Sequence, residues 1–202
     1  VVVENNEIAF NNAKGHWHYH EGGGVKFFRS SNMSFRRNYV HHNLGPGLWM
    51  DTDSVNTLYE NNIVTDNDSH GIFHEVSGSA IIRNNTVERN ARGISVNNSS
   101  DVEVYGNNLK DNVSGLFISN VCRSEAINWT TKNVKVYNNT VHQKAHIGPS
   151  SEWTRGKAAV YRTVPTCSLW TTSFDAWHES MGNKFYNNSY YFSGVTMGSR
   201  PF

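Results

Sequence analysis

The sequence lacks a long hydrophobic run and has almost no excess of either charge. No apolar stretch approaches the roughly 18 residues that a membrane-spanning helix needs. A formal net charge of +1 offers neither a basic nucleic-acid-binding surface nor an acidic tail. The first residues, VVVENNEIAF, lack the basic and apolar segments of a signal peptide and already resemble folded structure. We therefore expect a mature or trimmed piece of a larger protein that binds neither nucleic acid nor membranes.

Cysteine is equally scarce, since the chain holds only Cys122 and Cys167. The abundance of Asn, Ser, Thr and aromatic residues is typical of an exported protein, in which such a pair forms a disulfide. Two buried free thiols are the alternative. We expect an extracellular or cell-surface protein, in which a Cys122–Cys167 disulfide would contribute up to about 4 kcal/mol through the loop that it closes.

Asparagine, by contrast, is abundant, and eight Asn-Asn pairs recur along the chain. Several of them lie within a repeated pattern, Asn-x-aliphatic-x-x-Asn, which glycine follows three or four residues later. The pattern returns every 22–24 residues in the central part of the chain, with fainter copies in VKVYNNTV (134–141) and KFYNNSYY (184–191). Its first residues are Asn6, Asn38, Asn62, Asn85 and Asn107. A period of this length indicates a solenoid.

The composition of each period distinguishes between two kinds of solenoid. Leucine-rich repeats require an LxxLxLxxN signature, which is absent. Each period instead holds short segments of β-branched residues with asparagine and glycine at the corners, where asparagine tolerates the left-handed conformation and can form ladders between coils. In these features residues 1–120 resemble the right-handed β-helix repeat family of the pectate-lyase-like superfamily. The resemblance implies an all-β, right-handed parallel β-helix with about 22–24 residues per coil. The fainter copies of the repeat predict that residues 121–202 continue this β-helix with long irregular loops, in a single domain.

Aligning the glycines, with Gly15 in the first coil, predicts which side chains share a face, because equivalent residues of successive coils lie about 4.8 Å apart. The positions one and three after glycine are mostly aliphatic and are predicted to face the interior. Among the inward residues are Leu48, Ile72, Ile94 and Leu116, with Val40, Val64 and Val87 on another inner wall. The positions two and four after glycine are predicted to face outward: Trp17, Trp49, Phe73 and Phe117, then Tyr19, Asp51, Glu75 and Asn97.

Asp51 and Glu75 close two similar segments, GLWMD and GIFHE, and so share an outward column on neighbouring coils. A contiguous patch of exposed aromatic side chains indicates a binding site. Aromatic rings beside carboxylates suit a sugar, whose apolar face stacks while the acids bond its hydroxyls or attack its anomeric carbon. We predict a polysaccharide- or oligosaccharide-binding face with Asp51 and Glu75 as catalytic residues; a solvated surface without a role is the alternative. The predicted ligand contacts are Trp17, Tyr19, Trp49, Asp53, His70, Phe73, Asn97 and Phe117.

The segments GLWMD and FHEV also resemble the paired motifs of β-helix glycoside hydrolases such as the family 120 β-xylosidases. This resemblance implies that Asp51 is the nucleophile and Glu75 the acid/base of a glycoside hydrolase acting on a plant or microbial glycan. Those enzymes carry an extra domain that shapes the pocket, so an additional domain of the same protein is an expected partner. A strand spacing of about 4.8 Å is close to the roughly 5–5.5 Å carboxyl separation of retaining enzymes, which predicts retention.

Two groups of residues raise the question of a metal. His16, His18 and His20 alternate along one segment and could hold zinc, although a register that turns His16 and His18 inward favours a structural role. Asp51, Asp53 and Glu75 could together offer oxygen ligands to calcium. We expect no cofactor, with calcium as the one candidate.

Two further functions compete with the hydrolase. A lyase or epimerase acting on uronic acids would need a lysine or arginine base on the same face, and the predicted outward columns contain none, although Arg92 or Arg123 could reach it from loops. A non-catalytic glycan-binding or adhesive β-helix would use the aromatic row without turnover. The sequence favours the retaining glycoside hydrolase over the adhesive protein, and both over the lyase or epimerase.

Overall fold

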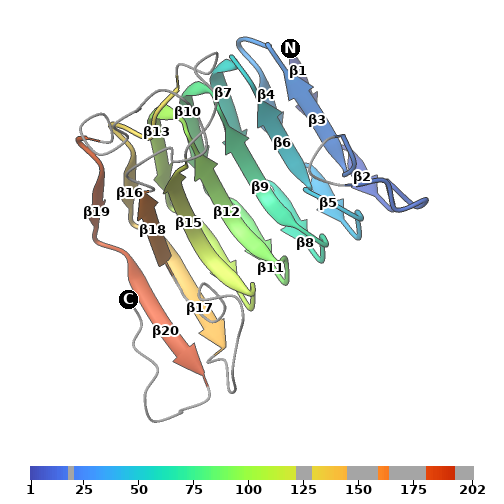
Figure 1. The fold of residues 1–202 in the computed structure, drawn as a ribbon. Helices are drawn as coiled ribbons and strands as arrows, with labels where there is room; N and C mark the ends of the chain where they lie inside the picture. Colours follow the sequence, from blue (N-terminus) through green and yellow to red (C-terminus); the bar gives the residue numbers. More distant parts are fainter. Residues whose placement is uncertain (18–20, 122–128, 145–158, 164–180, 194–202) are drawn as a thin grey trace.

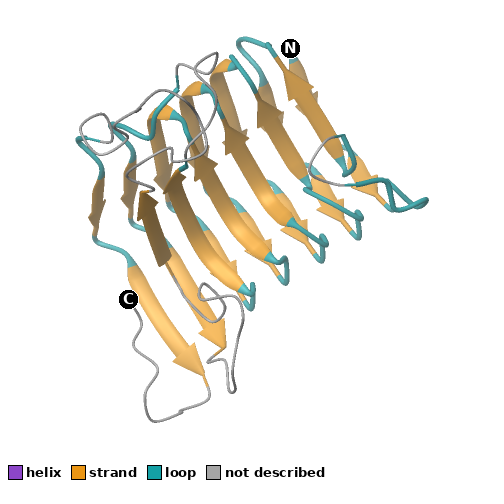
Figure 2. Cartoon of the chain, viewed as in Figure 1, coloured by secondary structure: helices purple, strands orange, loops and turns teal. Residues whose placement is uncertain are grey.

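A computed structural model gives the fold (Figure 1). The residues that it describes form strands β1 to β20 and no helix, and thus no helix that could cross a membrane (Figure 2). They are residues 1–17, 21–121, 129–144, 159–163 and 181–193. Both cysteines of the predicted disulfide lie outside the described residues, as do His18, Tyr19 and His20.

The strands form three parallel sheets that run along the whole molecule. Sheet A holds β1 (Val2–Glu4), β4 (Ser34–Arg36), β7 (Val55–Glu60), β10 (Gly78–Arg83), β13 (Ser100–Tyr105), β16 (Lys135–Tyr137) and β19 (Lys184–Tyr186). Sheet B holds β2 (Glu7–Ala9), β5 (Tyr39–His41), β8 (Ile63–Thr65), β11 (Thr86–Glu88), β14 (Asn108–Lys110), β17 (Thr140–Lys144) and β20 (Ser189–Ser193). Sheet C holds β3 (Val25–Phe28), β6 (Leu48–Asp51), β9 (His70–Glu75), β12 (Arg92–Asn97), β15 (Ser114–Asn120) and β18 (Ala159–Thr163). The predicted right-handed parallel β-helix is confirmed.

The predicted inner walls are also confirmed. Leu48, Ile72, Ile94 and Leu116 pair in register across β6, β9, β12 and β15, and all four side chains are fully buried. Val40, Val64 and Val87 form the corresponding wall of sheet B. The two fainter copies of the repeat supply β16, β17, β19 and β20, which continue sheets A and B. Burial of each large aliphatic side chain stabilises the coil by about 1.5–3 kcal/mol.

The first coil departs from the predicted register. Val25 pairs with Leu48, so Gly24 and not Gly15 is the counterpart of Gly47. His16, predicted to face inward, is exposed and lies in the segment that joins β2 to β3. The alignment on Gly15 was wrong because this corner is longer than those that follow it.

Buried asparagines form a ladder along the corner between sheets A and B. In each step the side-chain amide of one coil donates to Oδ1 of the asparagine in the next coil, and Oδ1 also accepts the backbone N–H of the first residue. The other hydrogen of the same side-chain amide is donated to a strand carbonyl of the preceding coil, as from Asn107 Nδ2 to the carbonyl oxygen of Ile82. From Asn38 to Asn139, every donor and acceptor of these amides is therefore satisfied. The ladder consists of Asn6, Asn38, Asn62, Asn85, Asn107, Asn139 and Asn188.

A second ladder of the same kind runs along the corner between sheets B and C. It consists of Asn11, Asn43, Asn67, Asn90 and Asn112. At the third corner, between sheets C and A, serine hydroxyls replace the amides: Ser77 Oγ accepts the N–H of Ser54, and Ser99 Oγ accepts the N–H of Ser77. All three corners thus pair their buried backbone groups with side chains of an adjacent coil.

The ladder predicts a large difference between two adjacent asparagines. Asn107→Ala removes the acceptor of two buried donors, the backbone N–H and one side-chain amide hydrogen of Asn85, at about 1–3 kcal/mol for each group. We expect a loss of at least about 3 kcal/mol in the free energy of unfolding, measured by urea denaturation. Asn108→Ala, at an exposed position of β14, is the control and should change stability by less than about 0.5 kcal/mol. Equal losses for the two variants would contradict the role of the ladder.

The interior also predicts a dependence of stability on pH. His74 is fully buried in β9, with Nδ1 3.4 Å from the Tyr59 hydroxyl, and burial lowers the pKa of its imidazole from 6.5 to about 3. Between these values the unfolded chain binds a proton that the folded chain does not, so stability should fall by about 1.4 kcal/mol per pH unit as the pH decreases from 6.5 to 3.

The variant His74→Met tests this dependence, because Met50 fills the same column on the neighbouring coil. Its unfolding free energy, measured from pH 7 to pH 4 by chemical denaturation, should depend less steeply on pH than that of the unmodified chain. His142→Gln, which removes an exposed histidine of β17, is the control and should keep the original slope. An unchanged slope in His74→Met would show that other groups cause the dependence.

Candidate functional site

The outward side of sheet C carries the predicted site residues and is called here the outer face of sheet C. One column of this face runs through Lys26, Trp49, Phe73, Ser95 and Phe117. The aromatic residues of this column are absent from the core cluster, which holds their inward neighbours such as Leu48 and Ile72. The predicted alternation between inward and outward side chains is therefore correct for sheet C from β6 onward.

The aromatic side chains of this column are nevertheless buried, so the prediction that they are exposed is wrong. Trp49, Phe73 and Phe117 expose only 3%, 7% and 5% of their surface. The Lys26 ammonium lies 3.9 Å from the centroid of the Trp49 ring, which stacks on Phe73 at 5.4 Å. The Arg92 guanidinium lies 4.2 Å from the centroid of Phe117. Cationic side chains thus cover the faces of two rings, an arrangement that the ring quadrupole favours.

Asp51 forms an ion pair in the next outward column. Lys26 Nζ lies 3.0 Å from Asp51 Oδ2, and both side chains are largely buried, with 14% and 16% of their surface exposed. The backbone N–H and the hydroxyl of Thr52 donate to Oδ1 at 2.8 and 3.0 Å. Both carboxylate oxygens are therefore engaged and oriented. The expectation that the outward columns contain no lysine or arginine is wrong, because the corrected register places Lys26 in the column of Trp49.

Glu75 lies one coil further along. The paired residues Met50 and His74 directly precede Asp51 and Glu75, so the two acids occupy the same column, as predicted. Glu75 is buried, with 6% of its surface exposed, and does not lie on the solvent side as expected. Asn97 donates to Glu75 Oε1 at 3.3 Å, and Ser119 donates to Asn97 Oδ1 at 3.1 Å. A polar row thus continues the column of acids across β12 and β15.

His70 and Arg92 form a second polar group where β9 and β12 begin. The two residues pair in register, and Arg92 Nη1 lies 3.0 Å from His70 Nε2. Because a guanidinium only donates, Nε2 of the imidazole is the acceptor of this hydrogen bond. The His70 ring also contacts Phe73 edge-on at 4.0 Å. The predicted site residue His70 therefore does lie beside the aromatic column.

The remaining predicted residues lie elsewhere. Trp17 is 64% exposed and lies in the segment between β2 and β3, outside the column, and Tyr19 falls outside the described residues. Asp53 accepts a hydrogen bond from Trp129 Nε1 at 2.9 Å and lies 3.8 Å from Arg29. Within the described part of the chain, no three His, Cys, Asp or Glu side chains lie close enough to hold a metal ion.

Lys26 is the residue that the sequence analysis missed. Its signal is the spacing of the glycines, because Gly24 precedes Gly47 by 23 residues and fits the period of the central coils, whereas Gly15 precedes it by 32. Alignment on Gly24 places VKFF beside LWMD, with Lys26 next to Trp49. The long first corner concealed this relation, since it also contains a glycine after an asparagine pair.

Two buried polar atoms of the aromatic column have no hydrogen-bond partner among the described residues: Trp49 Nε1 and Ser95 Oγ. Trp49 exposes 3% and Ser95 1% of its surface. A buried donor without a partner costs about 1–3 kcal/mol, a cost that a ligand or an ordered water removes when it accepts the hydrogen bond. The outer face of sheet C therefore combines cations, carboxylates and two donors without an acceptor.

Comparisons with known proteins agree with the fold. Two solved structures from Azotobacter vinelandii are similar: the A-modules of the mannuronan C-5 epimerases AlgE6 (TM-score 0.58, 15% identity) and AlgE4 (TM-score 0.52, 14% identity). The alignments cover 96% and 85% of this chain, but only 52% and 48% of those structures, so the chain spans about half of their length. No curated protein sequence matches the chain.

At this level of identity, the structural similarity concerns the fold alone. The sequence adds an assignment of its own, because the family model described as "Right handed beta helix region" matches residues 1–109, more than half of the 202 residues. The chain therefore belongs to the right-handed β-helix family.

Proposed function

We propose that this protein acts on an acidic polysaccharide at the outer face of sheet C, by removing the proton at C5 of a uronate residue. The observation that carries this proposal is the Lys26–Asp51 ion pair, which lies directly beside the buried ring of Trp49. It places a lysine on the same face as the acids, where the sequence had predicted neither lysine nor arginine. A polysaccharide substrate also fits the extracellular location expected from the composition.

The cations of this face suit the carboxylates of a polyuronate. Lys26 and Arg92 lie over rings at two points of one column, Trp49 and Phe117. Ammonium and guanidinium groups bind carboxylates through charge-assisted hydrogen bonds, which are shorter and stronger than neutral ones. Trp49 Nε1 and Ser95 Oγ belong to the same column and would donate to the hydroxyl or ring oxygens of the bound polysaccharide.

The same residues can support proton removal next to a carboxylate. A cation that pairs with the substrate carboxylate stabilises the negative charge that develops there when the C5 proton leaves. Asp51 forms an ion pair with Lys26 and accepts a hydrogen bond from Thr52, so we assign the transfer of this proton to Glu75. In a lyase, the electron pair of the C5–H bond forms a C4–C5 double bond, the C4–O bond breaks, and the leaving oxygen takes up a proton. In an epimerase, a proton returns to C5 from the opposite side.

The ion pair disfavours Asp51 as the nucleophile of a retaining glycosidase. A nucleophilic carboxylate has to present an oxygen to the anomeric carbon. Here Oδ2 faces Lys26 and Oδ1 accepts two hydrogen bonds from Thr52. Lysine neutralises the charge that would carry out the attack. The retaining hydrolase predicted from the sequence is the second candidate, and its products distinguish it from the lyase and the epimerase.

The structural neighbours support the substrate class. Both are named as mannuronan C-5 epimerases, and mannuronan is a polyuronate. Their names concern those proteins, and what they share with this chain is the coil that positions the outer face of sheet C. The assignment of C5 chemistry to this chain depends on its own residues Lys26, Asp51 and Glu75.

The reaction can be identified from its products. The protein is incubated with polymannuronate, polygalacturonate and neutral xylan in deuterated water. A lyase produces ultraviolet absorbance from the new double bond, whereas an epimerase incorporates deuterium at C5, which proton NMR detects. New reducing ends without either signal would identify a hydrolase and contradict the proposal, as would the absence of turnover and of binding to both polyuronates.

The role of the cation predicts a graded effect of substitutions at Lys26. Lys26→Met keeps an apolar stem on Trp49 but removes the charge, and it should weaken polyuronate binding, measured by affinity electrophoresis, by roughly ten- to a hundredfold. Lys26→Arg keeps the charge and should retain most of the affinity. The control Lys110→Met removes the same charge from an exposed position of β14 and should leave binding unchanged. Equal losses for Lys26→Met and Lys110→Met would indicate a general effect of net charge.

A further inference from the structure

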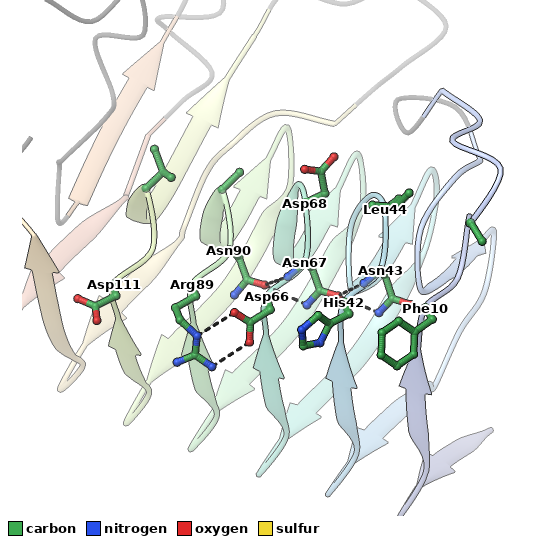
Figure 3. A pocket seen from close by; sticks show the side chains of 13 residues that line it. Phe10, His42, Asn43, Leu44, Asp66, Asn67, Asp68, Arg89, Asn90 and Asp111 are labelled. Atoms are coloured by element: carbon green, nitrogen blue, oxygen red, sulfur yellow. Dashed lines mark hydrogen bonds and ion pairs between the residues drawn. The ribbon is translucent and has the colours of Figure 1, made fainter.

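A second candidate site lies at the corner between sheets B and C, where a groove of about 810 Å³ runs across successive coils (Figure 3). Its floor includes Asn43, Asn67 and Asn90 of the second ladder. Five side chains that each precede a ladder asparagine project along it: Phe10, His42, Asp66, Arg89 and Asp111. Since they belong to five successive coils, the groove extends over about 19 Å at the strand spacing of a parallel sheet. This length fits a chain of several units better than a single small molecule.

The backbone at these five positions is left-handed, which is strained for Phe10 and Arg89, whereas aspartate and histidine adopt this conformation more readily. All five residues have φ between 51° and 57°, in the left-handed region. The corner between sheets A and B needs the same conformation at seven positions and fills six of them with asparagine or glycine, which adopt it at low cost. The seven are Asn5, Arg37, Asn61, Asn84, Gly106, Asn138 and Asn187. The groove thus carries aromatic and charged side chains where the corner between sheets A and B mostly uses asparagine. Backbone strain of this kind is often found at functional positions.

One end of the groove presents an aromatic platform. The rings of Phe10 and His42 stack at 5.3 Å with an interplanar angle of 24°, and Phe10 is 67% exposed. Leu44, which is 44% exposed, adds an apolar side chain to the same end. An exposed stacked pair of rings has no part in the core and offers a flat apolar surface to a ligand.

The middle of the groove presents a fixed carboxylate. Arg89 Nε and Nη2 donate to the two oxygens of Asp66, both at 2.8 Å, in the fork geometry that holds both planes rigid. The hydrogen bonds from Arg89 hold the pKa of Asp66 below its usual value. Asp68 and Asp111 bring the carboxylates that line the groove to three. They are opposed by the Arg89 guanidinium and by the ammonium of Lys144, which lies 3.4 Å from Asp111 Oδ2. This excess of negative charge repels polyanions and leaves carboxylate oxygens to accept hydroxyl groups.

We propose that this groove is a second binding site, which takes a neutral polysaccharide. The C–H face of one sugar ring would lie on Phe10 and His42, while the hydroxyls of the following units would donate to Asp66, Asp68 and Asp111. The charge of the groove is opposite to that of the Lys26 and Arg92 positions on the outer face of sheet C, so the two sites select different glycans. The proposal does not depend on the function proposed for that face.

The test measures binding of the neutral hexasaccharides xylohexaose, cellohexaose and mannohexaose to the intact chain by isothermal titration calorimetry. We expect at least one of them to bind. Phe10→Asn should weaken this binding by about tenfold through loss of the platform. It should also raise the melting temperature by a few degrees, because asparagine relieves the strain at this position. Absence of binding by all three sugars, or unchanged affinity in Phe10→Asn, would overturn the proposal.

Two arginines provide a matched pair of variants. Arg89 and Arg37 share the left-handed conformation and each pairs with a carboxylate, Arg89 with Asp66 in the groove and Arg37 with Glu4 at the corner between sheets A and B. Arg89→Asn should weaken hexasaccharide binding at least fivefold, whereas Arg37→Asn should leave it unchanged. Equal effects of the two variants would overturn the proposal, and so would competition by a lysine-rich peptide but not by a second neutral glycan. Lys26→Met should retain hexasaccharide binding, which keeps failure at this groove distinct from failure at the outer face of sheet C.

Discussion

The complete pairing of the buried asparagines is the constraint on which the rest of this structure depends. The ladder amides of the inner coils are enclosed between neighbouring coils, where an unpaired donor or acceptor would cost about 1–3 kcal/mol. Satisfying all of its groups requires the next coil to place another asparagine at the same corner, in the same orientation. Coils cannot slip against each other without breaking several such contacts at once. The register of the sheets, and with it every column of side chains, follows from this requirement.

The two ladders also determine where the coil can vary. Their asparagines are always five residues apart, as in the pairs Asn62–Asn67 and Asn85–Asn90, because both ends of each sheet B strand are pinned. The segment that leads from the second ladder to the first ladder of the next coil passes through sheet C, and its number of residues is not fixed in this way. Insertions such as the segment between Asn12 and Gly24 therefore adjoin sheet C. Segments of variable length and the candidate polyuronate site therefore lie on the same side of the molecule, next to sheet C.

This constraint explains how much could be predicted from the sequence. The Asn period revealed the fold, and the inner columns of Leu48 and Val40 followed from it, because buried positions repeat the same residue types. The first coil was misaligned because its long corner contains Gly15 after an asparagine pair, although the 23-residue spacing of Gly24 and Gly47 fits the period. The burial of Trp49 could not be predicted, since it depends on Lys26, which the faulty alignment had placed elsewhere. Outward columns vary from coil to coil, and their side-chain contacts have to be observed.

The three corners show how one backbone yields surfaces of different character. All need left-handed residues, and the corner between sheets A and B meets this need with asparagine and glycine at every position except Arg37. The stability that this corner and the ladders provide allows the chain to place Phe10 and Arg89 in the same conformation elsewhere, where each costs roughly 1–2 kcal/mol. Sheet C, whose strands and flanking corners vary in length, carries Lys26, Asp51 and Glu75. Because the sheet contacts of each coil are with its neighbours, the surfaces can change independently while the ladder keeps them in register.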